Sequence, residues 1–124
     1  MHMYFKKVVE FHEKFGGTWV DKPTLDLPDG YKEFRIDLMK EEFDEMCESI
    51  REGDVENLGK EFADLAIVFF WTILNFWYHH IFDDIYEEVH ASNMSKDPDP
   101  DGKKAIKWDS YFRADMKKFF EKIS

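Results

Sequence analysis

Apolar residues recur every three or four positions along most of the chain, and this period predicts helices rather than strands. The first helix is expected over residues 3–15, where Val8, Phe11, His12 and Phe15 recur at helical spacing. Gly16-Gly17 follows directly, and glycine commonly ends a helix. The chain is therefore expected to open with an amphipathic helix.

A loop and a second helix are predicted next. Residues 18–30 contain two prolines and an Asp-Gly pair, which predict a loop with a turn. The second helix is expected from about Lys32 to Arg51. Its apolar stripe consists of Met39, Phe43, Met46 and Ile50. The neighbouring line on the same helix consists of Leu38, Glu42, Glu45 and Ser49. Acidic residues therefore border the apolar stripe instead of lying opposite it.

The third predicted helix is the most hydrophobic part of the chain. It is expected over residues 55–78, with Asp54 as its N-cap. It begins amphipathic and then becomes apolar on every side from Leu65 to Leu74, apart from one threonine. A helix that is apolar all round must be covered all round. We therefore expect a partner subunit to complete the core, most simply an identical one.

Two shorter helices are predicted in the rest of the chain, over residues 81–94 and 114–123. The segment Asp97-Pro-Asp-Pro-Asp-Gly102 between them reads as a turn or loop. No stretch shows the alternation of a strand, and no internal repeat or interdomain linker is evident. The predicted fold is all-α, with four to five helices in a single domain over residues 1–124.

Composition narrows the class of protein. The chain has 124 residues, of which 44% are hydrophobic and 18% aromatic, and this excludes a disordered chain. The net charge of −10 opposes general binding to nucleic acid or to an anionic membrane surface. The apolar run from Leu65 to Leu74 is about half of the roughly 20 residues that span a bilayer. Cys47 is the single cysteine, so a reducing cytoplasm is the expected location.

Two acidic pairs stand out on the second and third predicted helices: Glu42-x-x-Glu45, preceded by Glu41, and Glu61-x-x-Asp64. Residues three apart share a helix face, so each helix offers adjacent carboxylates in one direction. Packed together, the pairs would crowd like charges, and no Lys or Arg lies within either motif. A hard divalent metal such as Mg²⁺ relieves this repulsion and bridges to phosphate oxygens. The pattern predicts a magnesium-dependent enzyme that acts on a phosphate ester or anhydride.

Simpler interpretations stand beside this one. Each acidic pair alone is also typical of a solvated helix face. The segment that begins at Asp97 resembles the start of an EF-hand loop, but Trp108 stands where a bidentate Glu is needed. Glu87-x-x-His90 matches half of a di-iron signature, and the second half is missing from the sequence. Calcium and di-iron sites are therefore disfavoured.

Positive charge gathers late in the chain. The lysines around the acidic turn are Lys96, Lys103, Lys104 and Lys107, with Asn93 before them and Tyr111 after them. These residues are compatible with an ordinary solvated loop. As a group, however, they supply the positive charge that a phosphate substrate needs and the acidic motifs lack.

Several motifs together resemble a known superfamily. The metal motifs read Glu-Glu-x-x-Glu at 41–45 and Glu-x-x-Asp at 61–64. Three ungapped pieces are Phe11-His-Glu-Lys-Phe-Gly16, Arg35-x-x-Leu-Met-x-Glu-Glu42 and Val89-His-Ala-Ser-Asn-Met-Ser-Lys96. A C-terminal set consists of Asp101-Gly102-Lys103, Lys107 and Tyr111. Over nearly its whole length the chain resembles the all-α NTP pyrophosphatases, which include MazG, the dimeric dUTPases and phosphoribosyl-ATP pyrophosphohydrolase.

This resemblance implies a fold, a cofactor and a reaction. The fold would be a helical bundle of the MazG and dimeric dUTPase type, completed as a dimer or a dimer of dimers. The cofactor would be Mg²⁺, with Mn²⁺ as a substitute, bound by Glu41, Glu42, Glu45, Glu61 and Asp64. The reaction would convert a ribo- or deoxyribonucleoside triphosphate to its monophosphate and pyrophosphate.

The resemblance also suggests roles for individual residues. Glu45 would orient or deprotonate the attacking water, and Lys96 and Lys107 would stabilise charge on the phosphates. Lys107, Asn93 and Tyr111 would complete the substrate-binding set.

Two other functions stay open: phosphoribosyl-ATP pyrophosphohydrolase itself, and a non-catalytic acidic helical module that binds a partner. The chain departs from the superfamily at Trp77-Tyr-His-His80, where a glycine-containing turn is usual, and at Phe112-Arg-Ala114, where prolines are usual. Both segments lie where base selection would be expected, so the resemblance leaves the base specificity open.

Overall fold

The computed structural model describes residues 2–17, 19–103, 105–121 and 123, so Lys104 lies outside the described residues. The chain forms two compact units, Met1–His79 and His80–Ser124. All regular elements among the described residues are helical, which confirms the all-α prediction. The β-pairing among the described residues is limited to one isolated antiparallel bridge between Asp97 and Ile106. The single domain over residues 1–124 stays a prediction.

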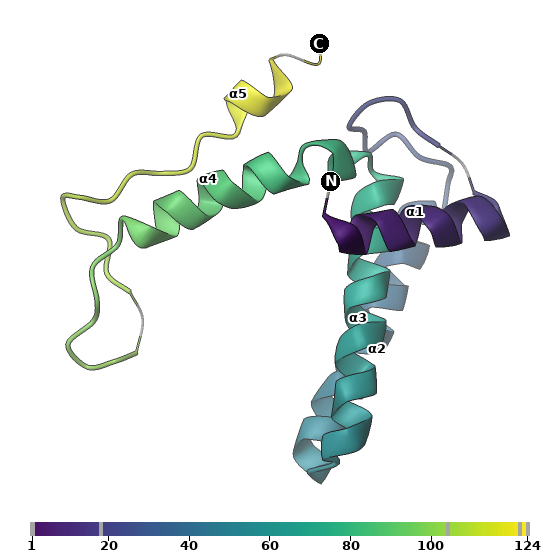
Figure 1. Ribbon diagram of the computed structural model, residues 1–124, viewed down its shortest axis with the longest axis horizontal. Helices are drawn as coiled ribbons and strands as arrows, with labels where there is room; N and C mark the ends of the chain where they lie inside the picture. Colours follow the sequence, from purple (N-terminus) through teal and green to yellow (C-terminus); the bar gives the residue numbers. More distant parts are fainter. Residues whose placement is uncertain (1, 18, 104, 122, 124) are drawn as a thin grey trace. The chain divides into compact units, whose positions relative to one another are not determined.

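The first unit contains three long helices. They are α1 (Met3–Phe15), α2 (Tyr31–Glu52) and α3 (Val55–Asn75). α2 and α3 lie side by side as an antiparallel hairpin, and α1 crosses α3 near its C-terminal half (Figure 1). Phe5 and Val8 of α1 are buried in this crossing, where the rings of Phe5 and Phe70 meet edge to face at 4.9 Å.

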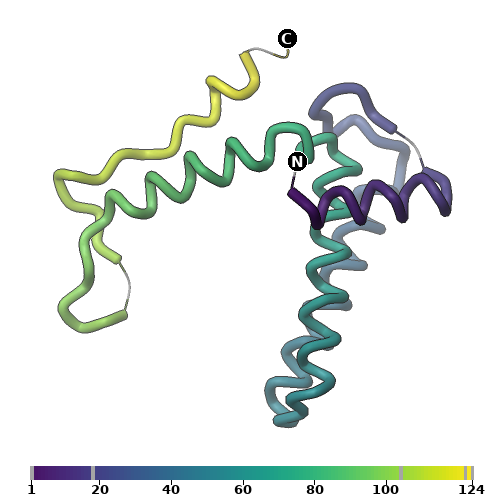
Figure 2. Tube along the Cα trace, in the orientation of Figure 1, coloured from purple at the N-terminus to yellow at the C-terminus, as the bar shows by residue number. Residues whose placement is uncertain are grey.

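A tight turn joins α2 to α3, as the tube in Figure 2 shows. Gly53 ends α2 with φ 73°, a left-handed conformation that glycine adopts without strain. The Asp54 side chain then accepts a hydrogen bond from the Asn57 backbone N at 3.0 Å, which confirms Asp54 as the N-cap of α3. Because the connection is so short, the C-terminal half of α2 must lie against the N-terminal half of α3. The two acidic motifs are therefore brought opposite each other.

α3 ends earlier than predicted, at Asn75 instead of Tyr78. Trp77 follows with φ 79°. Among the described residues, every other residue with a positive φ is a glycine. This left-handed position after a helix normally favours glycine. Trp77 therefore terminates the helix in a strained conformation, and the short 3₁₀ turn Tyr78–His80 follows.

The face that α2 presents to α3 differs from the apolar stripe. The buried residues of α2 are Arg35 and Ser49, which belong to the polar side of the helix. Phe43 and Ile50 of the stripe are instead 52% and 54% exposed. The polar line of α2 therefore packs against α3, and much of its apolar stripe faces outward.

The second unit contains α4 (Phe82–Met94) and the short α5 (Lys117–Phe120), and the chain between them runs back along α4 (Figure 1). The final helix was predicted over 114–123 and is shorter. Asp115 accounts for the difference, because its backbone N donates to Glu88 and its carboxylate accepts from the Lys117 backbone N. These bonds hold residue 115 outside the helix, which begins at Lys117. No helix among the described residues combines the length and the apolar character needed to cross a membrane.

Candidate metal centre

The interface between α2 and α3 is a polar seam rather than an apolar core. At one end the Tyr31 hydroxyl donates to Asn75 Oδ1 at 2.8 Å. One turn along α2, Arg35 donates to Thr72 Oγ1 at 2.8 Å and 3.2 Å. At the far end Asn57 donates to Ser49 Oγ at 2.7 Å. These bonds fix how far α2 and α3 slide along each other, and so which residues meet in the middle.

Three carboxylates meet in the middle of the seam. Glu42 and Glu45 come from α2 and Glu61 from α3, and each offers an oxygen within 4.8 Å of the others. Glu61 is buried at 6% exposure, Glu42 is half-buried, and Glu45 is exposed. Their spacing of three residues places Glu42 and Glu45 on one face of α2, and the tight turn brings Glu61 opposite them. The group is therefore closed on one side and open to solvent on the other.

Two oxygens of this group have no visible partner. Glu42 Oε2 and Glu61 Oε2 are buried, and neither has a hydrogen bond within the described residues. The other Glu61 oxygen, Oε1, accepts a long bond of 3.4 Å from Asn57 Nδ2. A buried carboxylate oxygen without a partner is unfavourable. Carboxylate oxygens are also the ligands that Mg²⁺ prefers, so the donor set fits a hard divalent cation.

The electrostatics of the seam point the same way. The pKa of Glu42 is raised above its ordinary value, first by burial and then by the nearby charges of Glu45, Asp64, Glu61 and Glu41. All four neighbours carry negative charge, so each disfavours ionisation of Glu42. A bound cation would reverse this effect by stabilising the ionised form.

The remaining predicted ligands are placed differently. Glu41 is exposed, and it lies outside the group of three, as Asp64 does. Asp64 Oδ2 instead accepts a bond of 2.8 Å from Lys60 Nζ, which also lies 3.8 Å from Glu61 Oε1. Lys60 was not among the predicted site residues, because this lysine precedes the Glu61 motif. Its position four residues before Asp64 was the signal that could have revealed it.

The predicted substrate-binding residues all lie in the second unit. Lys96 Nζ donates to Asn93 Oδ1 at 3.0 Å, and Lys107 Nζ lies 5.3 Å from the centre of the Tyr111 ring. The first pair lies at the C-terminal end of α4 and just after it, and the second pair lies on the segment that runs back along α4. Ser92 of α4 contacts this segment by donating from its hydroxyl to the Phe112 carbonyl at 2.7 Å. The structure thus brings these residues together in pairs.

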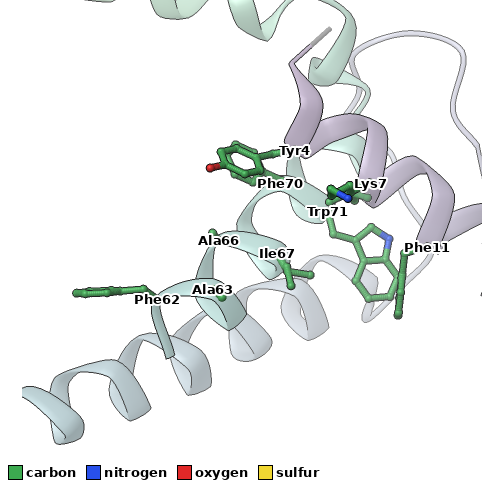
Figure 3. A pocket seen from close by; sticks show the side chains of 10 residues that line it. Tyr4, Lys7, Phe11, Phe62, Ala63, Ala66, Ile67, Phe70 and Trp71 are labelled. Carbon is green, nitrogen blue, oxygen red and sulfur yellow. The ribbon is translucent and has the colours of Figure 1, made fainter. Parts of the chain in front are cut away.

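An apolar groove of about 680 Å³ lies between α1 and α3. Figure 3 shows Tyr4 and Phe11 of α1 beside it and a row of α3 side chains along it. That row consists of Phe62, Ala63, Ala66, Ile67, Phe70 and Trp71. At 100° per residue, Ala63, Ala66 and Phe70 point away from the face of α3 that carries Glu61. The groove is therefore distinct from the carboxylate group.

A comparison with known protein families matches residues 8–93 to phosphoribosyl-ATP pyrophosphohydrolase. The match covers more than half of the chain and includes the three carboxylates of the seam. The chain belongs to this family. The phosphoribosyl-ATP pyrophosphohydrolase family is part of the MazG-like all-α NTP pyrophosphatase superfamily, which confirms the resemblance.

Members of the family are nucleotide pyrophosphohydrolases, so the chain is a hydrolase that acts on phosphoric anhydrides. The match ends at residue 93 and therefore before Lys96, Lys107 and Tyr111. A comparison with curated proteins found no match.

Proposed function

We propose that the chain is a magnesium-dependent pyrophosphohydrolase that converts a ribo- or deoxyribonucleoside triphosphate to its monophosphate and pyrophosphate. The observation that carries this proposal is the group of Glu42, Glu45 and Glu61 with its two buried, unpartnered oxygens. A purely solvated acidic face would leave those oxygens in water. The two buried oxygens therefore favour a metal site over an ordinary acidic surface.

Glu42, Glu45 and Glu61 would hold the metal, with Glu41 and Asp64 as the remaining ligands. Mg²⁺ is the proposed ion and Mn²⁺ a substitute, since both accept oxygen ligands. The ion would neutralise phosphate charge and lower the pKa of a bound water. Glu42 and Glu61 contribute oxygens that are already desolvated, so less water has to be removed when the cation binds.

The side chains have separate proposed roles. Glu45 is the exposed member of the group, so it is the carboxylate best able to reach a substrate water and accept its proton. Lys96 would stabilise charge that develops on the phosphates. Lys107 would stabilise this charge as well, and Asn93 and Tyr111 would position the sugar or the phosphates. No covalent intermediate is needed, because the reaction depends on positioning and electrostatics.

A second copy of the chain is the proposed partner, as a dimer or a dimer of dimers. Several large apolar side chains of α2 and α3 are about half exposed, namely Phe43, Ile50, Phe62, Ile67 and Phe69. The groove between α1 and α3 adds further apolar surface on α3 (Figure 3). Apolar surface of this extent favours association. Identical chains would cover each other's apolar faces while leaving the polar seams intact. A cytoplasmic location also stays a prediction.

The substrate is tested with a panel of compounds and Mg²⁺. The panel contains ribo- and deoxyribonucleoside triphosphates, modified triphosphates and phosphoribosyl-ATP, and both products are quantified. Equal amounts of monophosphate and pyrophosphate from a triphosphate support the proposal. Selective cleavage of phosphoribosyl-ATP would assign the chain to that reaction, which fits the family equally well. Release of inorganic phosphate, or no metal-dependent product from any compound, would contradict the proposal.

A further inference from the structure

Lys60 is the cation that pairs with the acidic motifs in the described part of the chain. Its ammonium lies 2.8 Å from Asp64 Oδ2 and 3.8 Å from Glu61 Oε1. We infer that Lys60 is an internal counter-cation that competes with the metal for Asp64 and contacts a substrate phosphate once it is displaced. This inference rests on the proposed function and adds a substrate contact inside the first unit.

The geometry separates the two acidic residues of α3. Glu61 is turned into the seam, where one oxygen is buried and unpartnered. Asp64 is turned toward Lys60 and does not belong to the group of three carboxylates. Since Lys60 and Asp64 are four residues apart on one helix, their pairing requires no rearrangement of the backbone. In the metal-free protein, Lys60 therefore occupies the carboxylate that a metal would otherwise bind.

The pair is weak enough to open. The Lys60 side chain is 68% exposed and that of Asp64 is 34% exposed, so water screens their attraction. A divalent ion on the neighbouring carboxylates would repel the ammonium and attract Asp64. The freed side chain is long and flexible, and lysine is a common phosphate ligand. In a chain of net charge −10, such a local cation would favour the approach of an anionic substrate.

The first test measures metal binding without nucleotide. MgCl₂ is titrated into the wild-type chain, Lys60→Met and Lys60→Arg by calorimetry. Lys32→Met is the matched control, because it removes the same charge from an exposed position at the start of α2. We expect Lys60→Met to bind Mg²⁺ about twofold to fivefold more tightly than Lys32→Met. Lys60→Arg should keep the wild-type affinity, since it preserves the competing charge.

The second test measures KM for the magnesium–nucleotide complex in the same proteins. Lys60→Met should raise KM about tenfold, whereas Lys60→Arg should restore most of the loss. The inference thus predicts opposite effects of Lys60→Met, with tighter binding of Mg²⁺ and weaker binding of the substrate.

Equal Mg²⁺ affinity in Lys60→Met and Lys32→Met would overturn the competition, and an unchanged KM would overturn the phosphate contact. If the wild type releases pyrophosphate and the variants give either of these results, only this inference is contradicted and the proposed function stands. A wild-type chain that neither binds Mg²⁺ nor releases pyrophosphate contradicts the proposed function and the inference together.

Discussion

The acidic residues of the seam are chemically alike, but each has a different environment. Glu61 is buried, Glu45 is exposed, and Asp64 is paired with Lys60. Glu42 has its pKa raised by burial and by its acidic neighbours. Such differences allow one carboxylate to bind metal while another accepts a proton from water. Substitutions at these positions should therefore have distinguishable effects.

Glu42→Gln should stabilise the metal-free protein at neutral pH and lower turnover about 100-fold. The raised pKa means that the folded state binds the Glu42 proton more tightly than the unfolded state does. The stability contribution of Glu42 is therefore fully present below its ordinary pKa of 4.5, and it is lost as the pH rises through the folded-state pKa. Glutamine mimics the protonated form, so its advantage should be seen at pH 7 and disappear below about pH 4.5.

Thermal melts across this pH range, with and without Mg²⁺, measure both effects. Mg²⁺ should raise the melting temperature of the wild type more than that of Glu42→Gln. If Glu42→Gln were less stable than the wild type at pH 7 in the absence of metal, the repulsive character of the group would be refuted.

Lys96→Ala should lower kcat about 100-fold while leaving the affinity for Mg²⁺ alone unchanged. The reason is that its proposed partner is phosphate, and its bond to Asn93 lies within the second unit. Lys117→Ala is the control, because it removes an exposed lysine from the same unit that belongs to none of the predicted substrate-binding residues. Kinetics and magnesium calorimetry on both variants make the comparison. Equal kcat in the two variants would remove Lys96 from the catalytic set.

The sequence predicted some of these residues and missed others for physical reasons. The acidic motifs could be recognised because a spacing of three residues on a helix is a local property. Burial of Glu42 Oε2 and Glu61 Oε2 depends on how α2 packs against α3, which no local pattern specifies. The pairing of Lys60 with Asp64 was not predicted because Lys60 lies outside the acidic motifs, although its spacing of four residues from Asp64 is also local.

At the scale of elements, the orientation of α2 differs most from what the sequence predicts. The helix was recognised from its period, and Tyr31–Glu52 lies within one residue of the predicted 32–51 at each end. The period does not show which face meets α3, however. Arg35 and Ser49 have hydrogen-bonding partners on α3, so these two polar side chains can be buried with their hydrogen bonds satisfied. The apolar stripe is left for another surface.

The loop after α1 depends on a close backbone approach at Gly17. A Cβ added there would lie 2.1 Å from His12 Cε1. The His12 ring cannot easily move, because it accepts a hydrogen bond from Trp71 Nε1 at 3.1 Å and packs edge to face on Trp19. Gly17→Ala should therefore lower the free energy of unfolding by about 1–3 kcal/mol.

Gly59 offers a control of the opposite sign. It lies inside α3, and a Cβ there would meet nothing within 4 Å. Gly59→Ala should raise the free energy of unfolding by about 0.5–1 kcal/mol, because alanine favours the helix. Urea denaturation followed by tryptophan fluorescence measures both variants. The packing of Gly17 on His12 would be refuted if both alanines were stabilising.

At the scale of the whole molecule, exposed apolar surface and high negative charge must be reconciled. The hydrophobic helix at residues 65–74 predicted a partner, and much of the outer surface of α3 is uncovered within the first unit. The sequence could not specify which residues are uncovered. Leu74 is 2% exposed and Ile67 is 48% exposed, although both belong to the same apolar run.

Ile67→Asp tests the dimer without disturbing the interior of the first unit. A buried, unpaired carboxylate in an interface is strongly unfavourable, so dimerisation should weaken at least about 100-fold. Val55→Asp is the control, because Val55 is 82% exposed at the start of α3. Light scattering over a range of concentrations reports the oligomeric state. If the wild type were monomeric and active, or if both variants stayed dimeric, the proposed interface would have to be abandoned.

The central claim is that the carboxylates of the α2–α3 seam form the metal centre that releases pyrophosphate. The most direct measurement is the initial rate of pyrophosphate release from the best triphosphate of the panel, for the wild type and Glu61→Gln, with Mg²⁺ and with EDTA. The wild type with Mg²⁺ should release pyrophosphate and monophosphate in equal amounts. EDTA should abolish this release, and a folded Glu61→Gln should show a loss of at least about 100-fold. Pyrophosphate release by Glu61→Gln at the wild-type rate, or release that persists in EDTA, would contradict the claim.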